Sequence, residues 1–153
     1  MPIPHIDAIL TAGVIPGTDK NESAIGIAWL RKHWQEWDRV EFNVGLGPGV
    51  DLGPGVPAYV QKSATASTKP KADIIVYRGD HVAGVVELKA RISGSALGQV
   101  LTYSHLLQRD NPRLLQVYKI VAGGSILTGI ETVYEHAGVT IELFPLALPA
   151  SST

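Results

Sequence analysis

Two largely apolar runs separated by a short polar turn place the strongest constraint on how this chain can fold. The runs are Ala72–Tyr77, "ADIIVY", and Val82–Leu88, "VAGVVEL", and the turn between them is "RGDH", residues 78–81. Short β-branched runs on either side of a glycine-containing turn are typical of a β-hairpin. We therefore expect a hairpin whose strands are buried over most of their length.

The second strand of this hairpin ends in charged residues. Residues 85–91, "VVELKAR", contain Glu87, Lys89 and Arg91. Alternate side chains of a strand face opposite sides, so Leu88 is expected in the core while the three charged residues share the other face. Because burying an ion without a partner is unfavourable, this face is expected to enter a cleft.

The remaining chain alternates helical and strand patterns. The expected elements are a helix from about residue 21 to 37 capped by Asn21, a strand at 39–46, a helix at 95–108, a strand at 114–124, a helix at 125–138 capped by Ser125, and a strand at 139–146. This order predicts a mixed α/β (α+β) sheet with helices packed on its faces.

Two segments lack such patterns. Residues 1–20 are punctuated by proline and glycine and are expected to form an irregular N-terminal arm. Residues 47–71 begin with a tandem repeat, "LGPGVDLGPGV", and continue as "QKSATASTKPK", which predicts a long loop inserted before the hairpin. Loops of this length are mobile or functional, so both a floppy insertion and a substrate-contacting flap stay open.

Composition narrows the class of protein. The 153 residues are expected to form a single domain, 1–153, and their net charge of −1 excludes a uniformly basic DNA-coating protein but not a local basic patch. The chain has no cysteine, which removes disulfides, cysteine-based zinc sites and thiol catalysis. No signal peptide or membrane span is recognised, so a soluble protein of the cytoplasm without membrane contact is expected.

The hairpin brings acidic groups together. Asp73 lies about as far before the turn as Glu87 lies after it, so two carboxylates and the Lys89 ammonium are expected to converge. Carboxylates supply the hard oxygen ligands that Mg²⁺ prefers, with water and substrate phosphate completing its shell. A bound Mg²⁺ polarises a phosphoryl group and activates water, and a lysine can orient that water. The set predicts metal-dependent hydrolysis of phosphodiesters.

A wider motif surrounds this set. Asp73 is followed by Glu87-Leu88-Lys89, and Gln99 and Tyr103 lie four residues apart on the next helix, which places them on one helical face. The pattern resembles the PD-(D/E)XK nuclease superfamily, in the subset that carries Gln-x-x-x-Tyr. In detail it is similar to the nuclease domain of type I restriction subunits and, more loosely, to helicase-linked nucleases of the RecB type.

The resemblance runs from Glu22, on the first helix, to about His105. One departure is that Pro70 precedes Asp73 by three residues, where the family has proline directly before the aspartate. The resemblance implies a restriction-endonuclease-like core, α-β-β-β-α-β with an added helix and strand. It also implies a nuclease that cuts DNA with Mg²⁺, for which Mn²⁺ can substitute. Endonuclease action is favoured, and exonuclease action stays open.

The resemblance also assigns roles. The implied metal ligands are Asp73, Glu87 and the backbone carbonyl of Leu88. Lys89 is implied to position the attacking water, and the other implied catalytic residues are Gln99, Tyr103 and Glu22. The residues expected to contact nucleic acid are Lys62, Lys69, Lys71 and Arg91. Two alternatives stay open: a non-catalytic DNA- or protein-binding module on the same fold, and a nuclease subunit that needs a motor or specificity partner. The oligomeric state, including a homodimer, also stays open.

Overall fold

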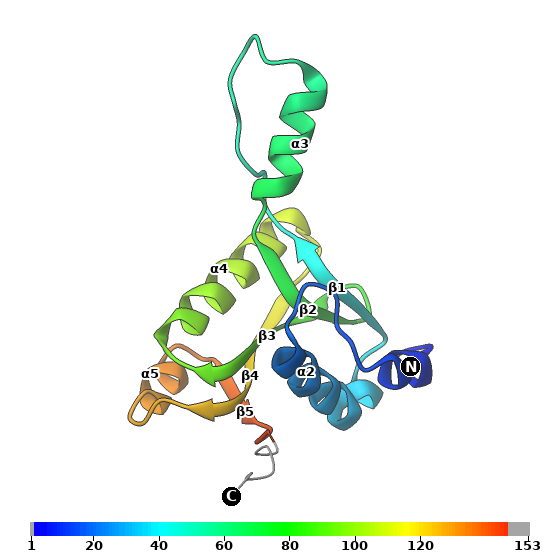
Figure 1. The fold of residues 1–153 in the computed structure, drawn as a ribbon, viewed down its shortest axis with the longest axis vertical. Coiled ribbons are helices and arrows are strands. Elements are labelled where there is room, and N and C mark those ends of the chain that lie inside the picture. The colour runs from blue at the N-terminus through cyan, green and yellow to red at the C-terminus, as the bar shows by residue number, and fades with distance from the viewer. Residues whose placement is uncertain (1, 147–153) are drawn as a thin grey trace, which may run out of the picture.

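A computed structural model describes residues 2–146, which form a five-stranded sheet with helices on both faces (Figure 1). The strands lie side by side in chain order: β1 (Arg39–Gly45), β2 (Lys71–Arg78), β3 (Val82–Ile92), β4 (Gln116–Ile126) and β5 (Thr140–Leu143). The first three strands are antiparallel to one another, whereas β4 and β5 run parallel to β3. The expectation of a mixed α/β sheet is confirmed.

Within the described residues, five α-helices accompany the sheet: α1 (Ile6–Ala12), α2 (Lys20–His33), α3 (Ala58–Thr68), α4 (Gly94–Asp110) and α5 (Glu131–His136). A short 3₁₀ turn, Trp34–Glu36, continues α2. Among residues 2–146, no helix combines the length and the apolar character needed to cross a bilayer.

The helices divide the core into two layers. On one face of the sheet, α2 buries Ile25 and Trp29 against β2 and β3 side chains that include Leu88. On the other face, α4 buries Val100 and packs against a second set that includes Val85. Apolar side chains from both faces of β2 and β3 are therefore removed from water, which is the main force that holds a central hairpin in place.

The hairpin predicted from the sequence is present. Ile74 pairs with Val86 and Arg78 with Val82, so the turn falls at residues 79–81. Gly79 has φ of +62°, a conformation that glycine adopts without steric cost. The predicted helix at 95–108 corresponds to α4, and the strand at 114–124 to β4, each within two residues at its start and end.

Helix boundaries near the N-terminus correct the prediction. Residues 1–20 are not wholly irregular, because α1 forms within them. Helix α2 is capped by Asp19, not by Asn21: the Asp19 side chain accepts from the Glu22 N–H at 2.8 Å, and the Glu22 side chain accepts from the Asp19 N–H at 3.0 Å. This reciprocal capping box satisfies two N–H groups that the helix cannot pair itself.

The last predicted helix is also shorter than expected. Ser125 is not its cap, because β4 continues alongside β3 as far as the pair Ile92 and Ile126. Helix α5 begins only at Glu131, after a turn in which Gly129 has φ of +90°. Strand pairing with a buried neighbour outweighs the ~1 kcal/mol that one serine cap would contribute.

Residues 47–71, called the arm below, project from the body of the protein (Figure 1). The sequence predicts no regular structure there, yet α3 occupies its second half. Gly45 pairs with Lys71, and the Leu46 N–H donates to the Pro70 carbonyl at 2.8 Å, so the arm leaves and rejoins the sheet at one point.

Candidate active site

Asp73 and Glu87 face each other where β2 and β3 part. The paired register of the two strands ends at Ile74 and Val86, one residue before this carboxylate pair. Beyond that point the Leu88 N–H donates to Asp73 Oδ2 at 2.9 Å. A side chain thus satisfies a backbone donor that the separating strands leave free, and the convergence predicted from the hairpin is confirmed.

The two carboxyl groups lie close enough for one to donate a hydrogen bond to the other when it is protonated. Burial, then the Asp73 charge, raises the pKa of Glu87 to about 9. Burial also raises the pKa of Asp73, although less decisively, because hydrogen bonds from Glu87 and Leu88 favour its charged form. The proton therefore resides on Glu87, which is only 4% exposed.

The surroundings of this carboxyl pair lack hydrogen-bond donors, and a cation could take their place. The buried Oε2 of Glu87 has no hydrogen-bond partner, and neither has the buried Oε1 of Gln99. Oxygens that lack donors, beside two carboxyls that cannot both ionise, are what a divalent cation would stabilise. Within residues 2–146, no three His, Cys, Asp or Glu side chains gather to hold an ion unaided, so Mg²⁺ would need backbone, water or substrate oxygens as well.

Lys89 follows on the same strand as Glu87, two residues further on, and is partly buried. Its positive charge acts on both carboxyls, favouring their ionised forms and lowering the pKa of each. The effect is smaller than that of burial, so the pair keeps its proton. Asp73, Glu87 and Lys89 thus form one electrostatic unit.

Helix α4 adds the two residues that the sequence places on one face. Burial raises the pKa of Tyr103, and the negative charges of Glu87 and Asp73 raise it further. The neighbouring Gln99 side chain acts in the other direction and lowers the pKa of Tyr103. Gln99 and Tyr103 therefore lie at the carboxyl pair, as the spacing predicted.

The N-terminus of α2 reaches the same region from the other side. The charge of Glu22 raises the pKa of Glu87, and the charge of Asp19 raises that of Asp73. Glu22 is therefore near the site, although its carboxylate also closes the capping box. The sequence reading missed Asp19; the spacing "DKNE", with an acid three residues before a glutamate, is the signal that could have found it.

The predicted nucleic-acid contacts separate into two groups. Lys71 is exposed at the first position of β2, two residues before Asp73, and Arg91 is exposed two residues beyond Lys89. Lys69 lies at the base of the arm, whereas Lys62 lies within α3, away from the carboxyl pair. The first two therefore border the site, and the others extend along the arm.

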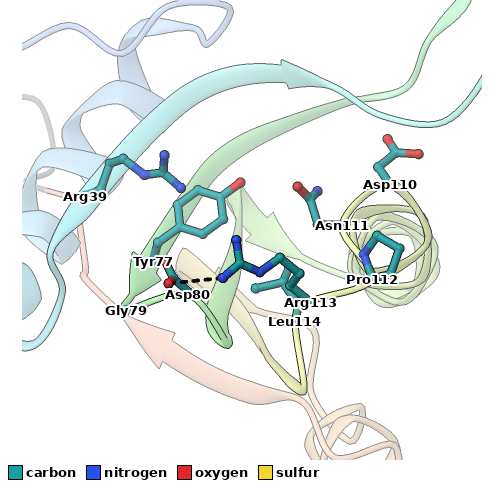
Figure 2. A pocket seen from close by; sticks show the side chains of 9 residues that line it. All are labelled: Arg39, Tyr77, Gly79, Asp80, Asp110, Asn111, Pro112, Arg113 and Leu114. Atoms are coloured by element: carbon teal, nitrogen blue, oxygen red, sulfur yellow. Dashed lines mark hydrogen bonds and ion pairs between the residues drawn. The ribbon is translucent and has the colours of Figure 1, made fainter.

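A separate hollow of about 320 Å³ lies at the turn end of the hairpin (Figure 2). Its lining includes Tyr77, with the Arg39 guanidinium 4.0 Å from the ring centre, and an ion pair of 3.3 Å between Arg113 and Asp80. Burial, then Glu41, raises the pKa of Tyr77 to about 12, so its hydroxyl stays protonated. The predicted site residues are not among those that line this hollow.

Comparisons with protein-family models, curated proteins and solved structures find no match to this chain. What the chain does must therefore be argued from the geometry above.

Proposed function

We propose that this chain is a metal-dependent deoxyribonuclease that hydrolyses phosphodiester bonds at Asp73, Glu87 and Lys89. The observation that carries the proposal is the buried carboxyl pair, in which Glu87 Oε2 has no hydrogen-bond partner beside a lysine. A purely structural ion pair would place opposite charges in contact, whereas this arrangement buries two acidic groups together, which is unfavourable when both ionise. Such a cost is expected where a cation binds.

The order of elements supports the finer fold assignment. Apart from α3, which is inserted between β1 and β2, the elements α2, β1 to β3, α4 and β4 occur in the order α-β-β-β-α-β, with α5 and β5 added after them. The antiparallel hairpin and the parallel β3–β4 pair joined through α4 are the arrangement expected of a restriction-endonuclease-like core. The proposal includes that core, with the site where β2 and β3 part.

Each residue would have a distinct task. Asp73, Glu87 and the Leu88 carbonyl would hold Mg²⁺, or Mn²⁺ in its place, which supplies charge neutralisation at the phosphate and a water of lowered pKa. The Lys89 ammonium would orient the attacking water and stabilise charge that develops on the phosphoryl oxygens.

The surrounding residues would complete the constellation. Gln99 would use its unpartnered amide oxygen to fix the water or a metal-bound group, and Tyr103 would hold Gln99 through its hydroxyl. Glu22 would add negative charge at the rim and so strengthen cation binding. Lys71 and Arg91 would contact phosphates on either side of the cut, in keeping with endonuclease action.

The test is cleavage of supercoiled plasmid with Mg²⁺, with Mn²⁺ and with EDTA. Lys89→Ala and Asp73→Asn are each expected to lower the rate at least ~100-fold. Arg31→Ala, which removes an exposed charge from α2, serves as the control and should leave the rate unchanged. Cleavage that survives both site substitutions, or that persists in EDTA, would overturn the proposal.

A second measurement is used if the protein does not cut DNA by itself. Isothermal calorimetry with Mg²⁺ and Mn²⁺ reports binding without turnover. A protein that binds DNA but neither metal would be a non-catalytic module on this fold. One that binds metal but cuts only in a complex would be a subunit that depends on a motor or specificity partner.

A further inference from the structure

The arm is built without a core of its own. Within Ala58–Thr68 no side chain is buried, and Tyr59 is 77% exposed. An isolated helix of this length is marginal in water. The arm therefore projects into solvent without adding buried contacts that would stabilise the fold.

A few polar contacts nevertheless give the arm a defined shape. The Gln61 amide donates to the Val50 carbonyl at 2.8 Å and accepts from the Leu52 N–H at 2.8 Å, while the Thr68 hydroxyl accepts from the Val50 N–H at 2.7 Å. At its base the Gly47 N–H donates to Asp110 Oδ2 at 2.9 Å, which fastens the arm to the end of α4. These bonds hold the first half of the arm against α3.

Positive charge is concentrated on the arm. It carries Lys62, Lys69 and Lys71 and one acid, Asp51, for a formal charge of +2, although the whole chain has −1. The other residues together therefore carry −3. A local excess of this sign on a slender projection attracts a polyanion such as a nucleic-acid backbone.

The arm is also narrow enough to fit a groove. Seven of the 11 residues of α3 are Ala, Ser or Thr, so the helix has few long side chains. The major groove of B-DNA is ~12 Å wide and admits an α-helix. At ~1.5 Å per residue α3 is ~16 Å long, about half a turn of duplex.

The arm joins the sheet beside the carboxyl pair. Helix α3 leads directly into β2, and Lys71 lies two residues before Asp73. A duplex whose phosphate lay at Asp73 would therefore pass along the base of the arm, and Tyr59, in the first turn of α3, would meet it further out.

We infer that the arm is a clamp for double-stranded DNA, with α3 in a groove of the duplex and Lys62, Lys69 and Lys71 on its phosphates. This deepens the proposed function and rests on it, because it names the form of the substrate and the surface that grips it. The arm supplies affinity, and the site between β2 and β3 supplies the chemistry.

The test is equilibrium binding in EDTA, where no cleavage is expected, to a labelled duplex of about two helical turns. Lys62→Ala is expected to weaken binding ~3–10-fold at ~0.1 M salt and to reduce the slope of log K against log salt by about 1. Alanine favours the helix, so folding is preserved. Arg31→Ala removes the same charge from α2, at the other end of the molecule (Figure 1), and should change neither quantity.

A second pair of variants tests the shape of the arm without changing its charge. Gly49 has φ of +71°, and a Cβ there would run into the Thr65 carbonyl of α3. Gly53 has φ of +86°, but a Cβ there meets nothing within 4 Å. Gly49→Ala should therefore weaken duplex binding more than Gly53→Ala, with circular dichroism checking that both proteins fold.

The outcomes separate the clamp from the nuclease. Duplex binding and salt slope unchanged by Lys62→Ala, or equal affinity for single strands, would overturn the clamp even if Lys89-dependent cleavage persists. Weakened duplex binding by Lys62→Ala in a protein that does not cut would uphold the clamp and count against the nuclease. Arm substitutions that alter sedimentation of the free protein, and not DNA binding, would make the arm a protein contact and overturn the clamp.

Discussion

Replacing the buried Glu87 with glutamine should stabilise the metal-free protein at alkaline pH. Burial, then the Asp73 charge, raises the pKa of Glu87 from its ordinary value of 4.5 to about 9. A group whose pKa is higher in the folded state favours folding while it is protonated and loses that contribution as pH rises. Wild type should thus lose stability between pH 4.5 and about 9, whereas Glu87→Gln, which keeps the shape of the protonated acid, should not.

The magnitude follows from the same two values. At pH 8 the folded protein still holds most of the proton, while the unfolded chain has released it. The interval between 4.5 and pH 8, at ~1.4 kcal/mol per pH unit, sets a ceiling of ~5 kcal/mol. We expect Glu87→Gln to gain ~2–5 kcal/mol at pH 8, which is large against a typical total of ~5–15 kcal/mol.

Urea denaturation in EDTA from pH 5 to pH 8 measures the difference. With a urea dependence of ~2 kcal/mol per molar, the midpoint of the variant should exceed that of wild type by about 1–2.5 M at pH 8, and the gap should close toward pH 5. Asp80→Asn is the control, because it makes the same change from carboxyl to amide at a side chain that is 72% exposed at the hairpin turn. A variant no more stable than wild type at pH 8, or a gap that does not depend on pH, would refute the assignment of the proton to Glu87.

Three further predictions concern the support of the site. Burial alone would raise the pKa of Glu142, but hydrogen bonds from a histidine and a lysine of α2 outweigh this effect and lower the pKa. Glu142→Gln should therefore lower the free energy of unfolding by ~1 kcal/mol at pH 7, measured by urea denaturation, and this difference should disappear as pH falls below ~4.3. A difference that grows in acid would contradict the prediction. Gly26→Ala should cost ~1–3 kcal/mol because its Cβ would overlap buried side chains, including Ile15, whereas Gly98→Ala in α4, with nothing within 4 Å, should gain ~0.5–1 kcal/mol; thermal melts of equal midpoint would contradict this pair. Ser23→Ala should cost ~1–3 kcal/mol, since the Ser23 hydroxyl accepts from the buried Ile15 N–H at 3.0 Å, and Ser23→Thr, which keeps the hydroxyl, should recover part of the loss.

The hairpin could be predicted from sequence because its information is local. Two apolar runs and one turn fix which residues pair, and that register alone places Asp73 opposite Glu87. The four-residue spacing of Gln99 and Tyr103 likewise needs only helix geometry. These features use periodicity, which a single sequence displays directly.

Other features could not be read in this way. Helix α3 has no apolar face, so hydrophobic periodicity gives no signal, and its shape depends on side-chain bonds such as that of Gln61 to the Val50 carbonyl. The N-cap of α2 was placed two residues too late because Asn21 and Asp19 both suit that position, and only the reciprocal bonds with Glu22 distinguish them. The raised pKa of Glu87 depends on burial, which arises from both packed layers together.

The way in which the arm joins the sheet has a consequence for how such a chain can diversify. Its two ends meet at the pair Gly45 and Lys71, so residues can be gained or lost between them without shifting the register that aligns Asp73 and Glu87. The entropy cost of a closed loop rises only slowly with its length. The length of the arm and its preference for a polyanion can therefore change through this one insertion, while Asp73 and Glu87 keep their spacing.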